Sequence, residues 1–588
     1  MDQQKPEQLN NGSASFDLES ILREFSRQQP QTAPPPQIPP EPAPAPEQQP
    51  RIRSVAPPSL QEQFRSSARA LGAARIRLFL LGLATLFALL LFANSLPATP
   101  PVSLPEGSVG LLSAGVTLAA LLLAYEVALH ALAELMRIRI GVYALGILAA
   151  LLSIYDALRY GSFLWVLACV QLFSLQRSLV SAHSARASTL HRLVGMTRPD
   201  GVFRTKKLPD GTSALRTDKG NPIDFLLNLD HTDGPKRLGT PFTTALALSS
   251  PLLAYLLVPR AQASFVRAWL SLLLGALPLC AALSYTRPFG ALCRRLSKNA
   301  ALCGWHATRL FSGKYTVVLR DEDLFAAGSV VPNGMKLYSP LTASRVIAYA
   351  LAALEAAGSP LAEVFEELLR TQSGKHCTAA AYRCYDDGGI EAEVAGETVL
   401  VGSVGFMQSI GVHMPKGARL RQAVYVSIGG ELAGIFALKY NMSASVISGL
   451  RELLSKSRLD IVLMTRDFLI TPELLAAKLN ASTRQMRFPP YGRRLRQPAW
   501  EKVGNIGQGA LVARGDFGAF ASSVAAAKTL RTAASVNLFL TLLAGVLGFL
   551  TCALMLFWGT VPTALHLAVY QLLWALLAEF SCWLCLHL

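Results

Sequence analysis

The chain has 588 residues, enough for several domains. Hydrophobic residues make up 51% of it and charged residues only 16%, whereas a soluble protein carries about 25% charged residues. This composition excludes an ordinary soluble protein and predicts an integral membrane protein. The formal net charge of +17 at pH 7 is compatible with nucleic-acid binding, but the placement of the basic residues, described below, argues against a nucleic-acid partner.

The first 70 residues (1–70) are rich in Gln and Pro and predict a disordered cytoplasmic tail. Within this tail, the segment SFDLESILREF at 15–25 places four apolar residues on one helical face, namely Phe16, Ile21, Leu22 and Phe25. A short amphipathic segment in a disordered tail is typical of a docking peptide that folds on a protein partner. A fraying helix without a partner explains the same pattern equally well.

Apolar stretches of about 20 residues, the length that crosses a bilayer, recur along the rest of the chain. They predict about eight membrane helices, near 75–96, 108–133, 138–158, 161–179, 241–259, 264–286, 534–557 and 561–586. The helices fall into the segments 75–183, 241–286 and 534–588. Arg residues follow alternate spans, which is the positive-inside pattern and predicts that both termini are cytoplasmic. We expect a plasma-membrane protein whose surroundings are the lipid bilayer, with no nucleic acid as partner.

Two longer polar segments separate the spans. Residues 184–240 combine alternating residues with Asp-Gly turns, which predicts a small β domain. Residues 287–533 alternate short Val/Ile/Leu runs with helical stretches, which predicts an α/β domain with a parallel sheet. We expect 287–340 and 434–533 to form this domain together, with a second domain inserted at 341–433. The basic stretch RFPPYGRRLRQPAW at 487–500 is interpreted as a loop that faces anionic lipid or a partner.

The order of spans and soluble segments resembles that of the heavy-metal class of P-type ATPases, over residues 75–588. Six stretches match in the right order; among them, ALPLCAALSYTRP at 276–288 is similar to the family's Cys-Pro-Cys span. VGNIGQGALVARGDFGAFA at 503–521 resembles the family's metal-binding loop. The resemblance implies a haloacid-dehalogenase-like α/β domain, an inserted α+β nucleotide-type domain and a small β actuator-like domain beside the membrane helices.

Most residues that perform phosphoryl transfer in this family are replaced in this chain. The family has Asp-Lys-Thr-Gly-Thr, but here TVVL is followed by Arg320, or by Asp321 in a register shifted by one, and then by Glu-Asp-Leu-Phe. The family's Thr-Gly-Asp becomes Thr-Arg-Asp at 465–467, and Gly-Asp-Gly-x-Asn-Asp becomes Gly-Asn-Ile-Gly-Gln-Gly at 504–509. The second change removes carboxylates that would bind Mg²⁺. The Thr-Gly-Glu loop of the actuator insert is also missing.

Four residues remain at catalytic positions as remnants: Asp321, Asp323, Thr465 and Asp467. Asp321 and Asp323 also fit the Asp-x-Asp opening of the wider phosphatase superfamily, as nucleophile and acid/base, although a solvated turn at a strand end is the favoured interpretation. Tyr440 stands where the family has a further Asp.

Other residues are candidates for ligand binding. Gly389 and Gly402, in the Gly-rich strands of the nucleotide-type domain, are candidates for nucleotide contact. Pro278 is kept in the sixth span, but leucines flank it where the family has thiols, which leaves Cys280 as a metal candidate. Three residues near the end of the chain are within helical reach of one another and have side chains that bind soft metals, namely Cys582, Cys585 and His587. Apolar packing is the favoured role for all these cysteines.

These observations favour a catalytically degenerate, P-type-ATPase-like membrane protein that acts as a binding or regulatory scaffold and needs no cofactor. The alternative is a divergent cation transporter that uses ATP and Mg²⁺, with Asp321 as the phosphoryl acceptor. A third hypothesis is a phosphatase of the same superfamily.

Overall fold

The computed structural model describes residues 59–94, 108–206, 213–229, 233–311, 315–415, 420–455, 459–496 and 504–587. The docking peptide expected at 15–25 lies outside these ranges. The predicted disordered tail 1–70 is wrong for residues 60–70, since helix α2 already begins at Leu60. A capping box stabilises this start, because Glu62 N–H donates to Ser59 Oγ and Ser59 N–H donates to Glu62 Oε2.

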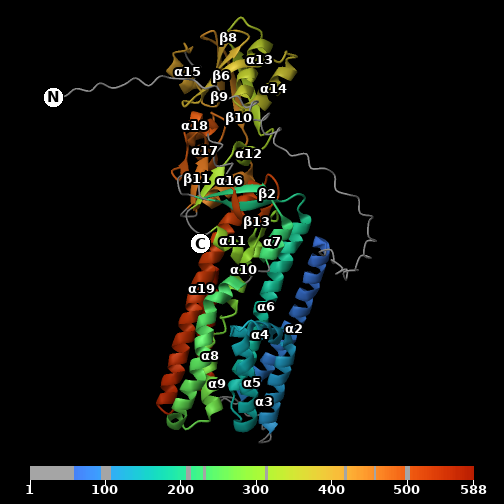
Figure 1. Ribbon diagram of the computed structural model, residues 1–588, viewed down its shortest axis with the longest axis vertical. Coiled ribbons are helices and arrows are strands. Elements are labelled where there is room, and N and C mark those ends of the chain that lie inside the picture. The colour runs from blue at the N-terminus through green and yellow to red at the C-terminus, as the bar shows by residue number, and fades with distance from the viewer. Residues whose placement is uncertain are drawn as a thin grey trace, which may run out of the picture. The chain divides into compact units, whose positions relative to one another are not determined.

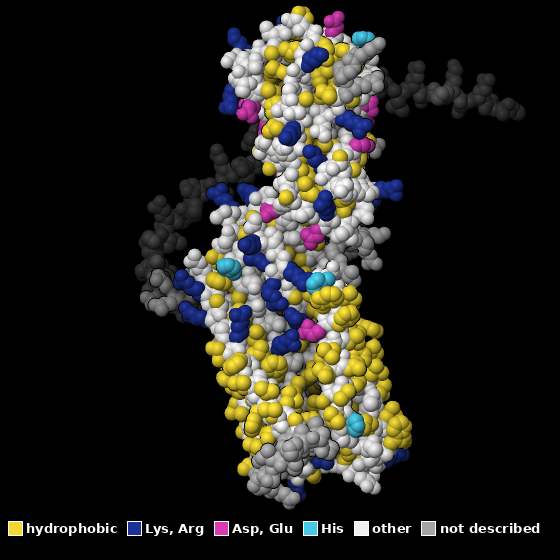
Figure 2. Space-filling model, turned by 180° about the vertical axis from the view of Figure 1, so that it is seen from behind, with side chains coloured by type: hydrophobic (Ala, Val, Ile, Leu, Met, Phe, Trp, Pro, Cys, Tyr) yellow, Lys and Arg dark blue, Asp and Glu magenta, His cyan; other side chains and the backbone are white. Residues whose placement is uncertain are grey.

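Long apolar helices form a bundle, and two sheets with their helices make up the rest of the described region (Figure 1). The bundle helices are α2 (Leu60–Asn94), α3 (Ser108–Leu123), α4 (Tyr125–Met136), α5 (Val142–Tyr160), α6 (Leu164–Gly195), α8 (Asp233–Ala261), α9 (Phe265–Ala276), α10 (Leu283–Arg295), α19 (Phe517–Phe557) and α20 (Ala564–His587). Figure 2 shows hydrophobic side chains over the outside of the bundle and Lys and Arg gathered where the bundle meets the soluble layers. This distribution is that of a multi-pass membrane protein.

The number of spans depends on how broken helices are counted. Among the described residues, six helices are long and apolar enough to cross a membrane. The pair α3 and α4, bent by 70°, forms a seventh span if it is taken as one, and α9 is a shorter apolar helix. Eight spans are reached if the bent pair α3 and α4 is counted as one span and α9 together with α10 is counted as another.

A side chain of the last helix pairs several backbone groups at the break after α9. Proline lacks a backbone N–H, and at Pro278 the helix unwinds until α10 begins. Gln571 of α20 accepts a hydrogen bond from Leu279 N–H at 2.9 Å. Its amide nitrogen donates to the carbonyls of Leu274 at 2.6 Å and Leu277 at 3.2 Å. Because an unpaired backbone group inside a membrane costs several kcal/mol, Gln571 stabilises this break.

Seven strands form the sheet nearer the bundle, in the order β12-β11-β4-β2-β1-β13-β3. Their bounds are β1 (Asp200–Thr205), β2 (Ala214–Lys219), β3 (Ala300–Leu302), β4 (Tyr315–Leu319), β11 (Leu459–Leu463), β12 (Met486–Arg487) and β13 (Asn505–Val512). The helices of this layer are α7 (Pro222–Leu229), α11 (Gly304–Leu310), α12 (Asp321–Leu324), α16 (Ala444–Ser455), α17 (Pro472–Leu479) and α18 (Tyr491–Arg496). Strands β12, β11, β4 and β2 are parallel, whereas β1, β13 and β3 run antiparallel to their neighbours, so the sheet is mixed and the expected parallel sheet is only half of it.

The expectation of a separate small β domain at 184–240 is wrong. Its two strands enter the seven-stranded sheet, where β2 pairs with β4 and β1 pairs with β13. Much of the rest of its described part is helical, since α6 extends to Gly195, α7 spans Pro222–Leu229 and α8 already begins at Asp233. A two-stranded hairpin is marginal by itself, and pairing on both sides satisfies the backbone groups that its edges would otherwise expose.

The second sheet has six antiparallel strands in the order β5-β10-β9-β8-β7-β6. Their bounds are β5 (Val330–Leu337), β6 (Ala379–Tyr385), β7 (Gly389–Val394), β8 (Glu397–Gly402), β9 (Ala423–Ile428) and β10 (Glu431–Tyr440). Its helices are α13 (Ala343–Ala356), α14 (Leu361–Thr371) and α15 (Val404–Ile410). The sheet extends beyond the expected domain 341–433, because β5 and β10 pair with each other rather than with the first sheet.

Close helix packing in the bundle gives a test of this fold. A Cβ on Gly548 of α19 would lie 2.0 Å from the carbonyl oxygen of Gly275 in α9. We expect Gly548→Ala to lower the free energy of unfolding by about 1–3 kcal/mol, measured as a lower thermal midpoint of the full-length protein in detergent. Gly115→Ala in α3 is the matched control, because nothing lies within 4 Å of its Cβ position. Equal midpoints for the two variants would contradict this helix crossing.

Candidate functional site

Two neighbouring strands deliver the predicted remnant residues to one edge of the first sheet. Strands β4 and β11 are parallel, and Leu319 at the end of β4 pairs with Leu463 at the end of β11. The residues that follow them, Asp321 and the stretch 465–467, therefore emerge side by side. Carboxyl ends of parallel strands are where ligand sites form in open α/β sheets.

The Asp321 carboxylate is hydrogen-bonded to the opposite loop. Its Oδ2 accepts from Arg466 N–H at 2.7 Å, and its Oδ1 accepts from Asp467 N–H at 3.3 Å. Arg320 precedes helix α12 as its N-cap, and its N–H donates to Asp323 Oδ2 at 2.8 Å. Of the two registers that the sequence leaves open, it is therefore Asp321 that meets the loop, while Asp323 closes the first turn of its own helix.

The Asp467 carboxylate is held by a tyrosine. Tyr440, the last residue of β10, donates its hydroxyl to Asp467 Oδ2 at 2.6 Å, and Leu469 N–H donates to Oδ1 at 2.8 Å. Tyr440 is completely buried and Asp467 is 2% exposed. The hydroxyl thus replaces solvent as the partner of this carboxylate. The sequence marks Tyr440 as a departure from the family pattern but does not indicate its contact with Asp467.

A cation that the sequence reasoning missed completes the cluster. Arg494 of α18 donates from Nη1 to Thr465 Oγ1 at 2.9 Å and from Nε to the carbonyl of Pro489 at 2.7 Å. Tyr491 of the same helix is buried and donates its hydroxyl to the Arg466 carbonyl at 3.2 Å. These two residues belong to the basic stretch 487–500, which the sequence analysis assigns to an outward-facing loop. Both side chains instead contact the loop after β11, at Thr465 and Arg466.

Burial controls the charge of this cluster. Desolvation raises the pKa of Asp321 to about 6, although the hydrogen bonds from the backbone N–H groups of Arg466 and Asp467 lower it. Desolvation also raises the pKa of Asp467 to about 7, and the nearby Asp321 carboxylate raises it further, while the hydrogen bond from Tyr440 opposes the rise. The Arg494 guanidinium favours the charged form of both groups. Near neutral pH, and with no cation bound, the pair therefore carries less than two negative charges.

The stretch that stands in place of the family's metal-binding loop is also far from Asp321. Residues 505–509 lie in β13, paired with β1, and β13 is three places from β4 in the sheet. At about 4.8 Å per strand the separation is roughly 14 Å, whereas Mg²⁺ ligands lie at about 2.0–2.1 Å from the ion. Among the described residues no group of three or more His, Cys, Asp or Glu could hold a metal ion.

The two glycines that are candidates for nucleotide contact lie directly under an aromatic ring. Gly389 and Gly402 are paired across β7 and β8. A Cβ on either would lie within 2.4 Å of the ring of Phe406, which is completely buried. The space over both glycines is thus filled by the protein's own side chain, which gives them a packing role.

The cysteine and histidine candidates are not assembled into a metal centre. Cys280 is buried and its Sγ lies 3.7 Å from Thr541 Oγ1. His587, which the sequence analysis groups with Cys582 and Cys585, uses Nδ1 toward the Trp583 carbonyl at 2.7 Å, and its Nε2 lies 3.0 Å from Arg295 Nη2. Both ring nitrogens therefore have protein partners, and the expected group of three is not formed.

Comparisons with known proteins give distant likenesses. No protein-family model and no curated protein matches the chain. A zinc-transporting PIB-type ATPase in its E2.Pi state is similar at 14% identity and a TM-score of 0.43, over 87% of this chain and 99% of that one. A zinc-transporting PIB-type ATPase solved in a different state gives 16% and 0.42, over 86% and 99%. The catalytic domain of the CPx-ATPase CopB-B gives 13% and 0.23, over 32% and 67%.

The raised pKa of Asp467 predicts a dependence of stability on pH. The folded-state pKa of about 7 exceeds the ordinary 3.8, so the folded protein keeps a proton that the unfolded chain has released. Stability from this group is complete below about pH 4 and is lost as the pH rises through about 7. We expect Asp467→Asn, which stays neutral, to raise the thermal midpoint relative to the unmodified protein by more at pH 8 than at pH 5, because only part of the loss has occurred at pH 5. The gain is on the order of a few kcal/mol, since one pKa unit corresponds to about 1.4 kcal/mol.

Asp460→Asn is the matched control, because Asp460 lies on the same strand β11 but is 54% exposed and paired with Arg487. This control is expected to change the midpoint little at either pH. A difference between pH 5 and pH 8 that is the same in the Asp467→Asn variant and the unmodified protein would contradict a buried, proton-binding Asp467.

Proposed function

We propose that the chain is a P-type-ATPase-like membrane protein of the heavy-metal class that no longer transfers phosphate and acts as a binding or regulatory scaffold. The observation that carries the proposal is that the Asp321 carboxylate already accepts two hydrogen bonds from the protein's own backbone. The N–H groups of Arg466 and Asp467, in the loop after β11, donate to this carboxylate. Backbone N–H groups at such a position are suited to bind phosphoryl oxygens, and here a carboxylate of the protein takes that place.

The second support is the cost of reopening the site. A nucleophilic Asp321 would have to release two hydrogen bonds, and Asp467 would have to exchange Tyr440 for a cation. Hydrogen bonds to charged groups contribute about 1.5–3 kcal/mol each. Without Mg²⁺ little neutralises the charge of a transferring phosphoryl group, so the arrangement favours a closed site over a working one.

The proposed loss of transport has separate support in the bundle. Leu277 and Leu279 flank Pro278 and offer no ligand atoms for a metal, and the polar groups of the unwound segment bond to Gln571. Cargo that crossed here would have to displace the Gln571 amide from three backbone partners. The backbone groups that Gln571 pairs in this segment are therefore not available to a cation.

Loss of phosphoryl transfer is tested with the full-length protein in lipid-supplemented detergent, supplied with ATP, Mg²⁺ and either Zn²⁺ or Cu⁺. We expect no vanadate-sensitive ATP hydrolysis above that of the double variant Asp321→Asn, Asp467→Asn, because neither carboxylate is available. Thermal midpoints establish that both proteins are folded. Acid-stable, hydroxylamine-labile labelling by γ-labelled ATP, present in the unmodified protein and absent from Asp321→Asn, would instead identify an active cation transporter.

The scaffold role requires a protein partner, and the amphipathic segment 15–25 is the proposed contact. We expect a peptide of residues 1–30 to retain a specific protein, and Leu22→Asp to abolish retention, because the mutation places a charge on the apolar face. The control is Glu19→Gln, which lies on the polar face. Retention of the same proteins by the Leu22→Asp peptide would remove the basis for a docking role of this segment.

A further inference from the structure

A cavity of about 190 Å³ lies among helices α6, α10, α19 and α20. Most of its wall is apolar, formed by residues that include Val170, Phe173, Leu279, Leu283, Ala575 and Ala578. An apolar cavity of about 150 Å³ is large enough to hold a benzene ring. The cavity therefore has room for part of a hydrocarbon chain.

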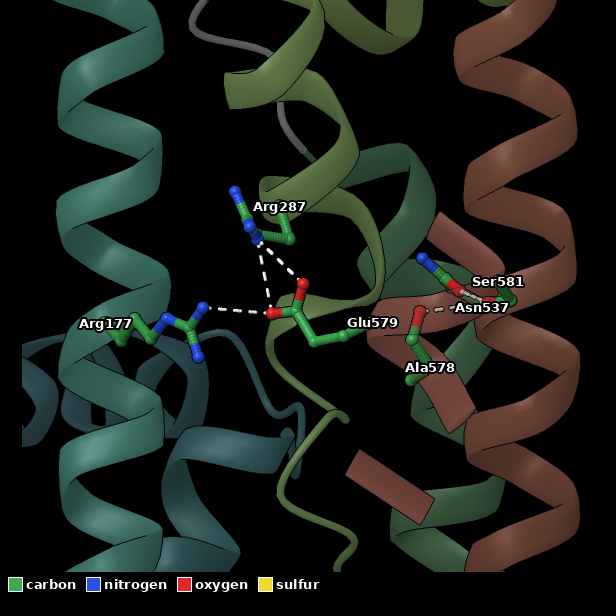
Figure 3. Close-up of polar contacts among 6 residues, drawn as sticks. All are labelled: Arg177, Arg287, Asn537, Ala578, Glu579 and Ser581. Carbon is green, nitrogen blue, oxygen red and sulfur yellow. Dashed lines mark hydrogen bonds and ion pairs between the residues drawn. The ribbon is translucent and has the colours of Figure 1, made fainter. Parts of the chain in front are cut away.

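The polar end of the cavity is formed by three charged side chains from three helices. Arg177 of α6 donates from Nη2 to Glu579 Oε1 at 2.9 Å. Arg287 of α10 donates from Nε to both carboxylate oxygens of Glu579, at 3.2 and 3.1 Å. Figure 3 shows the two guanidinium groups reaching Glu579 of α20 from different helices. Two cations share one anion, which leaves one positive charge in excess.

The guanidinium groups keep hydrogen-bond donors for a further ligand. Each has five N–H donors, and Arg287 uses only Nε toward Glu579. Within the described ranges its two Nη groups have no protein acceptor. The side chains of Arg177 and Arg287 are 42% and 33% exposed, so these donors are accessible. Among apolar helices an excess cation is costly unless an anion neutralises it.

The position of this cluster along the helices fits a lipid headgroup. Arg287 lies in α10, which leads through Arg295 into the soluble layers, and Glu579 lies about two thirds of the way along α20. The cluster is thus on the side of the bundle that carries the soluble domains, where Lys and Arg gather (Figure 2). By the positive-inside rule this is the cytoplasmic side, whose leaflet holds the anionic lipids.

We propose that this cavity binds one anionic phospholipid, with its phosphate on Arg177 and Arg287 and part of one acyl chain against the apolar wall. The excess positive charge disfavours binding of a cation. A free phosphate is also disfavoured, because it would leave the apolar wall of the cavity exposed to water. Asn537 also lines the cavity, and its Oδ1 accepts a hydrogen bond from Ser581 Oγ at 2.6 Å (Figure 3). The site is independent of Asp321 and Asp467 and does not depend on whether phosphoryl transfer is lost.

The test uses the full-length protein in nanodiscs of phosphatidylcholine with a minor fraction of phosphatidylglycerol, transferred to detergent for native mass spectrometry. We expect one phosphatidylglycerol molecule to be retained in preference to phosphatidylcholine. Arg287→Gln should lower this retention about tenfold, since hydrogen bonds to charged groups are strong. Glu579→Gln should increase it, because the mutation removes the negative charge that competes with the phosphate for the two arginines. A merely structural role of Glu579 would predict the opposite.

Two control variants distinguish binding in this cavity from non-specific electrostatic attraction of anionic lipid to the protein. Arg294→Gln removes the same charge from the same helix at an exposed position outside the cavity and should leave retention unchanged. Ala578→Leu fills the apolar wall without changing any charge and should lower retention. Glycerol phosphate, the soluble headgroup fragment, should compete poorly, because it lacks the chain.

Three outcomes would overturn the proposal. The first, which needs no variant to fold, is equal retention of phosphatidylglycerol and phosphatidylcholine by the unmodified protein. The second is a loss in Arg294→Gln as large as that in Arg287→Gln. The third is full displacement of the lipid by glycerol phosphate, which would identify a site for a free phosphate compound.

Discussion

The hydrogen bonds between the Asp321 carboxylate and the N–H groups of Arg466 and Asp467 are the constraint on which the rest of the soluble region depends. They join the ends of β4 and β11, and through Asp467 they extend to Tyr440 at the end of the second sheet. A buried carboxylate is costly unless donors surround it, so these donors are needed for stability. The same contacts that stabilise the edge of the sheet also occupy the groups that phosphoryl transfer would require.

The membrane bundle repeats this principle with different side chains. The backbone groups freed around Pro278 are paired by Gln571, and the charge of Glu579 is shared by two arginines. In both places a polar group that is expensive to bury has a partner from another helix. The difference is that both polar atoms of the Gln571 amide are hydrogen-bonded, whereas the arginines retain unused donors beside an apolar cavity. This contrast separates a closed structural contact from a site that can accept a ligand.

The insertion of β1 and β2 into the first sheet has consequences for chemistry as well as for architecture. The hairpin separates β4 from β13, so residues 505–509 are held in a strand far from Asp321. No local feature of 184–240 indicates this placement. Alternation predicts strands, but which edge a strand joins depends on the free hydrogen-bonding edges elsewhere in the chain. The same reason explains why β5 and β10 lie in the second sheet.

The sequence by itself determined the membrane character, the order of helical and soluble segments and the replacement of the expected carboxylates, because these follow from composition, local periodicity and residue type. Through the resemblance it also marked Asp321, Asp323, Thr465 and Asp467 as remnants of catalytic positions. Only the tertiary structure decided that Tyr440 and Arg494 contact this cluster, that Phe406 covers Gly389 and Gly402, and that Glu579 lies between two arginines. These contacts join residues far apart in the sequence, and their energies depend on burial and direction, which a linear pattern does not contain.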